Sequence, residues 1–395
     1  MRKGLPNKDF FKEKPYGYRR PSGRVGVRNR VGVMAAADNV NPLVRRLSET
    51  SDSLVCLTAS YGRGQLGKDL ELYLRTMGNL AAHPNLAGCL IVSFEPESAA
   101  RISEQAVKAG GQVQRLSMLV EGGMTRALER GHECLAEMLE AASAAVHEPI
   151  SPELLTVGLE CGGSDATSGI VANPALGLVA DALIDSGGTA VFSEPVECLG
   201  CEALLKARVE DPAEAARLVE TIKKYQEIAL EQGVDLTGVN PTSDNIAGGL
   251  STIEEKSLGA VSKAGSASIK GVLAYGEAPA ASGLWFMDAP AAAVENLTAL
   301  VAGGCQAVMF STGSVNPVGH PLAPTLKICA NPEYIRLMGE HVDVDLSPVI
   351  TGEITLYEAA RRVAEKLIRV INGELTAAER TGFIETRISR IGRSV

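Results

Sequence analysis

Aromatic residues and long apolar runs are both scarce in this sequence, and each absence excludes a class of protein. Aromatic side chains make up 4% of the 395 residues, whereas there are 41 glycines, a composition that favours an α/β protein built from small residues. No run is long and apolar enough to predict a transmembrane helix. Residues 1–20 are polar and lack the apolar stretch of a secretion signal, so we expect a cytoplasmic protein that contacts no membrane.

An excess of positive charge is also missing. The formal net charge of −9 argues against nucleic acid as a partner. A basic cluster near the N-terminus is the local exception, and it comprises Arg19, Arg20, Arg24, Arg28 and Arg30. This cluster could face an anionic substrate or a partner protein, or it could be a solvated surface arm.

The eight cysteines lack the spacing of a zinc site. Cys198 and Cys201 form a single Cys-x-x-Cys pair, and no second pair completes a set of four ligands. Others lie in apolar runs, where a thiol behaves as a small core residue: Cys56, Cys89, Cys305 and Cys329. Cysteines scattered through a large chain indicate reduced thiols, which agrees with a cytoplasmic location.

Short apolar runs alternate with helical patterns along the whole chain. The pattern predicts strands over residues 24–34, 53–58, 90–94, 113–119, 154–159, 190–192, 283–287, 307–310 and 325–328. Strands that alternate with helices imply parallel βαβ units. The proline-containing segment 147–152 separates two such sets. We therefore predict an α/β fold with two lobes, an N-terminal domain at 1–147 and a C-terminal domain at 148–395.

The densest chemistry follows the predicted strand at 154–159. There the sequence reads Glu-Cys-Gly-Gly-Ser-Asp from residue 160, in the C-terminal domain. The glycines let backbone N–H groups approach an anion, and Cys161, Asp165 and Ser168 could hold a metal or a polar substrate. The alternative is an ordinary strand–helix turn with hydroxyl caps. No Lys-Ser or Lys-Thr pair follows the glycines, which excludes a phosphate-binding P-loop.

Several other loops that follow predicted strands are unusually polar. They are residues 39–41, 60–65 and 193–197. The loops at 161–168 and 312–320, together with Lys256 and Lys263, belong to the same set. If the sheets are parallel, these loops gather at the same sheet edges, and we expect them to form a shared cleft. Carboxylates, a thiol, lysines and an arginine together suit elimination next to a carboxylate. A cation stabilises the enediolate, a base removes the α-proton, and an acid assists the leaving group.

Each candidate residue also has a simpler structural alternative. Arg63 lies between two glycines, where packing gives little reason for a long side chain, so we expect an anion contact. Lys263 lies among small residues and is the better candidate for proton transfer. Lys256 could merely pair with Glu254 or Glu255 across a turn.

The two glutamates that follow the predicted strand at 190–192 have two possible roles of equal weight. Glu194 and Glu197 could be metal ligands or surface charges. His320, alone in a Pro-Gly loop, is more typical of a structural histidine than of a ligand.

A set of short motifs is distributed along the chain. They occupy residues 23–29, 61–62, 83–85, 160–165, 168–169, 172–174, 248–249, 258–259 and 311–313, with Gln65, Glu254, Lys256 and Lys263. Together these motifs resemble the altronate/galactarate dehydratase family over nearly the whole length. The resemblance implies a lyase that removes water from a sugar acid and that typically needs ferrous iron.

Three departures separate the chain from the dehydratases of that family. They carry Cys where this chain has Asn39, His-x-Tyr-Gly-Cys where it has residues 59–63, and Gly-Cys-Glu where it has residues 95–97. The chain is similar to the large (beta) subunits of sulfolactate sulfo-lyase at residues 61–63, 95–96, 283–284, 286–288 and 340–345. That branch works with a separate small subunit, and Ala59 departs even from it. The implied reaction splits (2R)-3-sulfolactate into pyruvate and sulfite, and Arg63 suits a sulfonate.

We therefore predict a lyase that catalyses β-elimination from a small anionic 2-hydroxy acid. The expected companions are a separate small subunit, an oligomeric state and a divalent metal, iron. The predicted catalytic residues are Lys263, Lys256 and Glu97. The predicted metal ligands are Cys161, Asp165, Glu194 and Glu197, and the predicted substrate-binding residues are Arg63, Arg28, Asn39, Gln65, Ser164, Ser168 and Thr312. Two alternatives stay open: a sugar-acid dehydratase with an altered metal site, and a non-catalytic paralogue that scaffolds an active partner.

Overall fold

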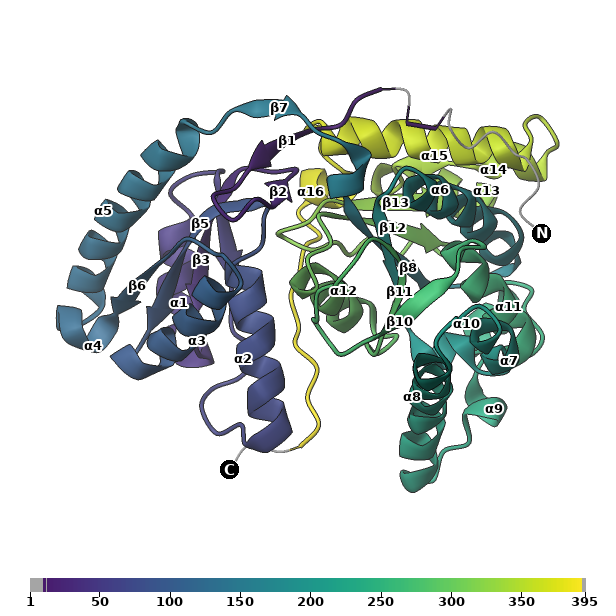
Figure 1. Ribbon diagram of the computed structural model, residues 1–395, viewed down its shortest axis with the longest axis horizontal. Helices are drawn as coiled ribbons and strands as arrows, with labels where there is room; N and C mark the ends of the chain where they lie inside the picture. The colour runs from purple at the N-terminus through teal and green to yellow at the C-terminus, as the bar shows by residue number, and fades with distance from the viewer. Residues whose placement is uncertain (1–9, 12, 393–395) are drawn as a thin grey trace.

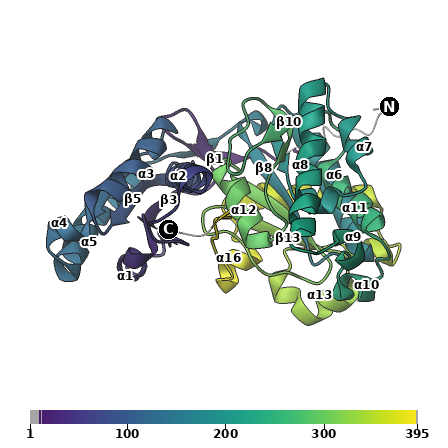
Figure 2. The same cartoon turned by 90° about the horizontal axis from the view of Figure 1, so that it is seen from below.

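Two lobes, each built on a parallel β-sheet, make up residues 10, 11 and 13–392, the part of the chain that the computed structural model describes (Figure 1). The predicted α/β class with parallel sheets is confirmed. Seen from below, the lobes lie side by side, and the last described residues lie between them (Figure 2).

The N-terminal lobe has a four-stranded sheet in the order β4-β3-β5-β6, and every neighbouring pair is parallel. Its strands are β3 (Arg30–Ala35), β4 (Leu54–Leu57), β5 (Leu86–Ser93) and β6 (Val113–Ser117). Its helices are α1 (Asn41–Ser48), α2 (Gly67–Ala81), α3 (Pro96–Lys108), α4 (Met118–Glu121) and α5 (Met124–Ser143). Helices α1 and α5 cover one face of the sheet, and α2 and α3 cover the other (Figure 1).

Strand β3 shows why the strands of this sheet are visible in the sequence as apolar runs. Val31 and Val33 pack in the core on the α1 and α5 side, whereas Met34 packs on the α2 and α3 side. A parallel strand covered by helices on both faces reads as a continuous apolar run. Both α1 and α3 carry proline in their first turn, where its missing N–H costs nothing.

The C-terminal lobe has a seven-stranded parallel sheet in the order β10-β11-β9-β8-β12-β13-β14. Its strands are β8 (Thr156–Gly162), β9 (Thr189–Phe192), β10 (Ile269–Leu273), β11 (Gly283–Met287), β12 (Ala307–Thr312), β13 (Thr325–Cys329) and β14 (Val344–Asp345). Its helices are α6 (Asn173–Asp185), α7 (Glu202–Lys206), α8 (Pro212–Glu231), α9 (Leu236–Val239), α10 (Ser243–Ala247), α11 (Ile253–Val261), α12 (Ala293–Ala302), α13 (Pro332–Met338), α14 (Ser347–Ile350), α15 (Leu356–Ile371) and α16 (Ala377–Thr381). Sequence analysis did not predict β10 and β14.

Strand β8 is the first strand of this sheet along the chain, and its neighbours are reached in opposite directions. β9 follows it in sequence and lies on one side, whereas β12 lies on the other. Open parallel sheets bind ligands outside the carboxyl ends of their strands at such a topological switch point. The loop that begins at Cys161 therefore leaves the sheet where a binding site is expected.

The stretch Ser168–Asp185 is long and apolar enough to cross a membrane by length and composition alone. It consists of a π-helical turn followed by α6, and 67% of it is buried inside the protein. Leu176 and Val179 of α6 belong to the same apolar core as Leu159 of β8. Its place as the central helix of the C-terminal lobe therefore accounts for its apolarity.

A small antiparallel sheet lies at the junction of the lobes. β1 (Tyr16–Arg19) pairs with β2 (Val25–Gly26) on one side and with β7 (His147–Pro149) on the other. The continuous strand predicted over residues 24–34 is therefore wrong. This stretch divides into β2, which joins the small sheet, and β3, which joins the N-terminal sheet.

The C-terminal tail, residues 382–392, returns to the N-terminal lobe and runs between the two lobes (Figure 1). The Tyr61 hydroxyl donates a hydrogen bond to the Ile388 carbonyl (2.7 Å). Farther along, the backbone N–H of Ile391 donates to the Asp69 carboxylate (2.7 Å). The tail thus contacts the loop after β4 and the first turn of α2.

Candidate active site

A surface pocket lies at the carboxyl ends of the N-terminal strands, and three predicted site residues meet in it. Its volume is about 260 Å³, and Arg63, Gln65 and Glu97 line it together with Arg101. The loop after β4 supplies the first two, and the start of α3 supplies the others. Sequence analysis missed Arg101. Its signal was the four-residue spacing from Glu97, which places both on one face of a helix.

Two arginines, Arg63 and Arg101, and two glutamates, Glu95 and Glu97, line the pocket. The Arg63 side chain is 70% exposed, and its guanidinium lies 3.5 Å from a Glu95 carboxylate oxygen. Helices α2 and α3 begin at this pocket, and neither has a side chain that caps its N-terminus. Their unpaired backbone N–H groups add partial positive charge. Two guanidinium groups and two helix N-termini suit a small anion.

Gln65 and Asn39, both predicted to bind substrate, have different surroundings. Gln65 is buried, lines the pocket, and donates from Nε2 to the Gly62 carbonyl (2.8 Å). Asn39 is exposed and does not line this pocket. Gly64 has a φ of 116°, a conformation that glycine adopts freely, and this allows the tight loop that aims Arg63.

A separate group of charged side chains is buried in the C-terminal lobe. The Lys263 ammonium lies 2.8 Å from a Glu194 carboxylate oxygen and 3.1 Å from the Cys161 sulfur. The backbone N–H of Cys161 donates to the same carboxylate (3.2 Å). Glu194 has a φ of 70°, which is unfavourable for a residue other than glycine. The contacts to Lys263 and Cys161 account for how this conformation is held.

Burial and charge act in opposite directions on this group. Burial lowers the pKa of Lys263, but Cys161 and Glu194 outweigh it, so this pKa lies well above its ordinary value. Burial raises the pKa of Glu194 against the opposing effect of Lys263, and burial raises the pKa of the Cys161 thiol well above its usual range. Glu194, whose carboxylate oxygen lies 2.8 Å from the ammonium, is the ion-pair partner of Lys263.

A second buried ion pair lies nearby. The Lys256 ammonium is 3.1 Å from a Glu197 carboxylate oxygen and donates to the side-chain oxygen of Asn240 (2.8 Å). The simpler alternative for Lys256, a pair with Glu254 or Glu255, is therefore wrong. Glu197 is also 9% exposed, so it is not the free surface charge that we considered as an alternative.

Asp165 organises the turn after β8. Its Oδ1 accepts hydrogen bonds from the Thr167 hydroxyl (2.8 Å) and the backbone N–H of Ser168 (2.7 Å). Its Oδ2 accepts from the Asn331 side chain (2.7 Å). The Ser168 hydroxyl donates to the Asp165 carbonyl (2.7 Å). Asp165 and Ser168 therefore form the hydroxyl-capped turn that was the structural alternative for this loop.

Two further predicted substrate-binding residues, Ser164 and Thr312, lie at the same sheet edge. The Ser164 carbonyl accepts from the Asn245 side chain (2.8 Å), and the Thr312 hydroxyl accepts from the backbone N–H of Asn316 (2.9 Å). Thr312 ends β12 opposite Gly162, the last residue of β8. Both residues flank the topological switch point, and their substrate contacts stay predictions.

The four predicted metal ligands do not gather. Among the described residues, no group of three or more His, Cys, Asp or Glu side chains could hold a metal ion. Cys161 and Glu194 contact Lys263, Glu197 pairs with the other lysine, and Asp165 closes a turn. This arrangement does not fit a metal, because an ammonium already lies against the thiol and the carboxylate.

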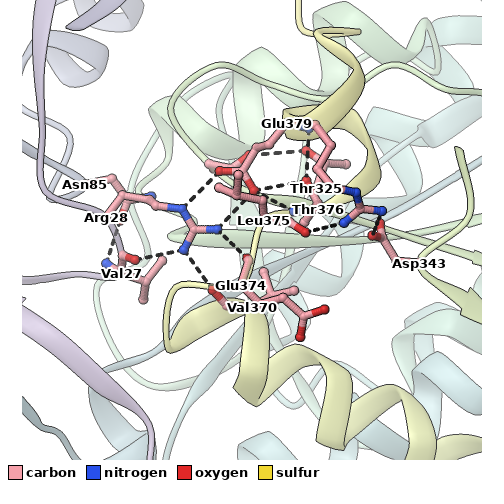
Figure 3. Close-up of polar contacts among 12 residues, drawn as sticks. Val27, Arg28, Asn85, Thr325, Asp343, Val370, Glu374, Leu375, Thr376 and Glu379 are labelled. Atoms are coloured by element: carbon pink, nitrogen blue, oxygen red, sulfur yellow. Dashed lines mark hydrogen bonds and ion pairs between the residues drawn. The ribbon is translucent and has the colours of Figure 1, made fainter. Parts of the chain in front are cut away.

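Arg28 lies at the joint between the lobes rather than in a substrate site (Figure 3). Its guanidinium donates to both Glu379 carboxylate oxygens (3.0 Å each). It also donates to the carbonyls of Val370 (2.8 Å), Glu374 (3.0 Å) and Val27 (3.0 Å). An arginine has five N–H donors, and these bonds occupy them. Substrate binding by Arg28 would require the joint to break, so the geometry assigns this residue to holding the lobes together.

The anion pocket and the buried ion pairs are separate in the structure. All the residues that line the pocket come from the N-terminal lobe, between positions 36 and 102. Lys263 and Lys256 belong to the C-terminal lobe and are buried, with 1% and 8% of their surface exposed. The structure therefore brings the predicted site residues together in two groups. A cleft shared by both lobes stays a prediction, as do the catalytic roles of the two lysines.

Sequence matches to known families cover both lobes. Residues 17–143 match the family described as D-galactarate dehydratase/altronate hydrolase, second domain. Residues 153–394 match the family described as D-galactarate/altronate dehydratase, C-terminal.

Curated relatives match over nearly the whole chain. The (2R)-sulfolactate sulfo-lyase subunit beta of Chromohalobacter salexigens is 37% identical over 96% of this chain and 97% of that protein. The altronate dehydratase of Bacillus subtilis is 32% identical over 97% of this chain and 80% of that protein, and the altronate dehydratase of Escherichia coli is 33% identical over 95% and 77%.

These relatives are named as a sulfo-lyase and as dehydratases, so the chain is an enzyme of the lyase class. The non-catalytic scaffold that we considered from the sequence is set aside accordingly. The chain belongs to the D-galactarate/altronate dehydratase family.

Proposed function

We propose that this lyase catalyses β-elimination from a small anionic 2-hydroxy acid, and that its substrate is (2R)-3-sulfolactate. The observation that carries the proposal is the exposed Arg63 in a pocket with a second arginine and two helix N-termini. The 37% identity to a (2R)-sulfolactate sulfo-lyase subunit beta, over 97% of that protein, supports the same substrate.

The reaction needs a base and a site for the leaving group. The C2–H bond breaks and its proton passes to the base, while the C3–S bond breaks and sulfite leaves with the electron pair of that bond. A C2=C3 double bond forms, and the resulting enol becomes pyruvate when C3 takes up a proton. A sulfonate must therefore be held next to a basic side chain.

The pocket supplies both requirements. Arg63 and Arg101 are suited to the sulfonate, because each guanidinium presents a planar fork of donors. Glu97 lines the same pocket and is our choice for the base. Lys263 and Lys256 remain candidate acids for this reaction. That role requires the substrate to reach them through a cleft between the lobes.

Sulfite release from (2R)-3-sulfolactate tests the proposal, with the chain alone and together with a sulfo-lyase small subunit. We expect pyruvate and sulfite in equal amounts, and loss of both products in Glu97→Gln. Glu104→Gln, an exposed position on the same helix, is the matched control and should keep wild-type activity. No sulfite in either preparation would overturn the substrate assignment.

A sugar-acid dehydratase is the second candidate. The two altronate dehydratases that match at 32% and 33% identity favour it. This candidate predicts a 2-keto-3-deoxy acid as the product from altronate or a related acid. Detection of that product, with no sulfite from sulfolactate, would decide in its favour.

Three companions of the enzyme are also proposed: a separate small subunit, an oligomeric state and iron. The first follows the name of a relative, which is a subunit beta. Light scattering of the purified protein measures the oligomer, and co-purification with a small subunit tests the partner. Metal analysis tests the iron that the family resemblance implies, which the ion pairs of Cys161 and Glu194 do not favour.

A further inference from the structure

Three polar side chains in the core of the C-terminal lobe leave hydrogen-bonding groups unused. Within the described part of the chain, no partner exists for either carboxylate oxygen of Glu160, for the Lys327 ammonium or for Nδ2 of Asn296. All three residues are 0% exposed. Unpaired buried groups are costly, and native proteins satisfy nearly all of them with protein, water or ligand. The Lys327 side chain and Nδ2 of Asn296 can donate hydrogen bonds, and the oxygens of Glu160 can accept them.

The register of the sheet places two of these groups in one row. Glu160 of β8 pairs with Phe310 of β12, and Phe310 pairs with Lys327 of β13. Paired residues on neighbouring strands point to the same face of a sheet. The Lys327 ammonium lies 3.2 Å from the centre of the Phe310 ring, over the side chain that separates it from Glu160.

Helix α12 covers this face and brings Asn296 to the same level. A Cβ on Gly158 would lie 3.2 Å from Leu300, so Leu300 faces β8 two residues before Glu160. Asn296 precedes Leu300 by about one helical turn, and a crossover helix runs antiparallel to its strands. One turn of helix and two residues of strand are both about 6 Å long. Oδ1 of Asn296 accepts from the Ser193 hydroxyl (2.6 Å), which leaves Nδ2 as the free donor.

The position of the row in the sheet points to a ligand. Glu160 and Lys327 each lie two residues before the carboxyl end of their strand. Between them lies β12, and β8 and β12 flank the topological switch point. Donors and an acceptor that lack partners are thus grouped next to the crevice where parallel sheets bind ligands.

We infer that Glu160, Asn296 and Lys327 form a binding site for a small 2-hydroxy carboxylate. The ligand carboxylate accepts hydrogen bonds from Lys327 and Asn296, and the ligand hydroxyl donates to Glu160. The proposed function supplies the chemical class of the ligand, whereas the existence of the site follows from the unpaired groups. The site is distinct from the pocket of Arg63.

A purely structural role explains Lys327 poorly. Its ammonium contacts the ring of Phe310 and has no hydrogen-bond partner within the described residues. Methionine has a similar length and would fill the same space without an unpaired buried polar group, so a structural residue at this position would gain from the exchange. A group that is kept at a cost in stability is typical of a functional site.

Lys327→Met tests the site with lactate as the probe, because lactate has the carboxylate and the hydroxyl but no leaving group. We expect lactate to raise the unfolding temperature of the wild type. In Lys327→Met this shift should vanish, while the unfolding temperature without lactate stays equal or rises. Lys108→Met, an exposed lysine on α3, is the matched control and should keep the shift. A wild type without a shift, or Lys327→Met with a full shift, would overturn the inference.

Glu160→Met gives a second test that does not depend on the stability of the first variant. Propionate lacks the hydroxyl of lactate, so we expect the wild type to bind lactate more tightly by about tenfold or more, and Glu160→Met to bind both acids equally. A wild type that binds the two acids equally would contradict the role of Glu160.

The two proposals can fail separately. Lactate binding that depends on Lys327, without sulfite release from sulfolactate, would leave this site standing and remove the substrate assignment. Sulfite release, combined with lactate binding that is unchanged in Lys327→Met, would support the substrate assignment and remove this site.

Discussion

The two lobes hold their charged side chains in opposite ways. In the N-terminal lobe, the Arg63 side chain is 70% exposed and 3.5 Å from its carboxylate partner. In the C-terminal lobe, the Lys263 side chain is 2% exposed and 2.8 Å from Glu194. An exposed pair contributes little to stability and can exchange its partner for a ligand, whereas each member of a buried pair depends on the other. In these two pairs, the exposed Arg63 is available for a ligand, whereas the buried Lys263 is held by its partner.

Removal of the buried cation should have the largest effect on stability. Lys263→Met leaves the Glu194 carboxylate buried without its ion-pair partner, and we expect the free energy of unfolding to fall by about 3–5 kcal/mol. Urea denaturation measures this change. Adding Glu194→Gln should recover part of the loss, because the uncompensated charge is then gone. A single variant as stable as the wild type would break the comparison between the lobes.

Arg63→Ala should have the opposite signature. Because the side chain is exposed, we expect the free energy of unfolding to change by less than about 0.5 kcal/mol. The value of kcat/KM for sulfolactate should fall by about 10- to 100-fold, which corresponds to the loss of a charge-assisted hydrogen bond. Arg63→Lys should recover only part of it, because lysine lacks the planar fork. Arg46→Ala, an exposed arginine on α1, serves as the control, and unchanged kinetics in Arg63→Ala would contradict the pocket assignment.

The joint between the lobes should show the smallest effect, and it depends on pH. Burial raises the pKa of Glu379, but Arg28 outweighs it, so this pKa lies below the ordinary value of 4.5. Such a carboxylate stabilises the fold above its unfolded-state pKa, and this contribution is lost as the pH falls through the folded-state value. We expect the wild type to lose about 1 kcal/mol more than Glu379→Gln between neutral pH and a pH below the folded-state pKa. If the free energies of unfolding of the two proteins change equally across that pH range, the Glu379 carboxylate does not contribute to the joint in this way.

Local patterns predicted the features that depend on neighbouring residues. The apolar runs that become β3, β5 and β12 were visible because strands covered on both faces are continuously apolar. The polar loop after β4 was visible because its polar residues are adjacent in sequence, and Arg63, Gln65 and Glu97 line one pocket.

Features that depend on distant residues were missed. The small sheet pairs β1 with β7 across more than a hundred residues, so no local pattern reveals it. The partners of Lys263 and Arg28 come from other elements, so no local pattern indicated the ion pairs that these side chains form. Lys327 did leave a signal, since it is a single charged residue inside an apolar strand.

The return of the tail to the first lobe has a consequence for synthesis on the ribosome. Ile388 contacts Ser60 across 328 positions of sequence. During translation the first lobe therefore emerges long before the segment that covers it, and its loop after β4 faces water or chaperones until then. In a chain stalled before the tail is made, we expect the four-stranded sheet of the N-terminal lobe to be formed while the loop after β4 lacks its contacts with the tail.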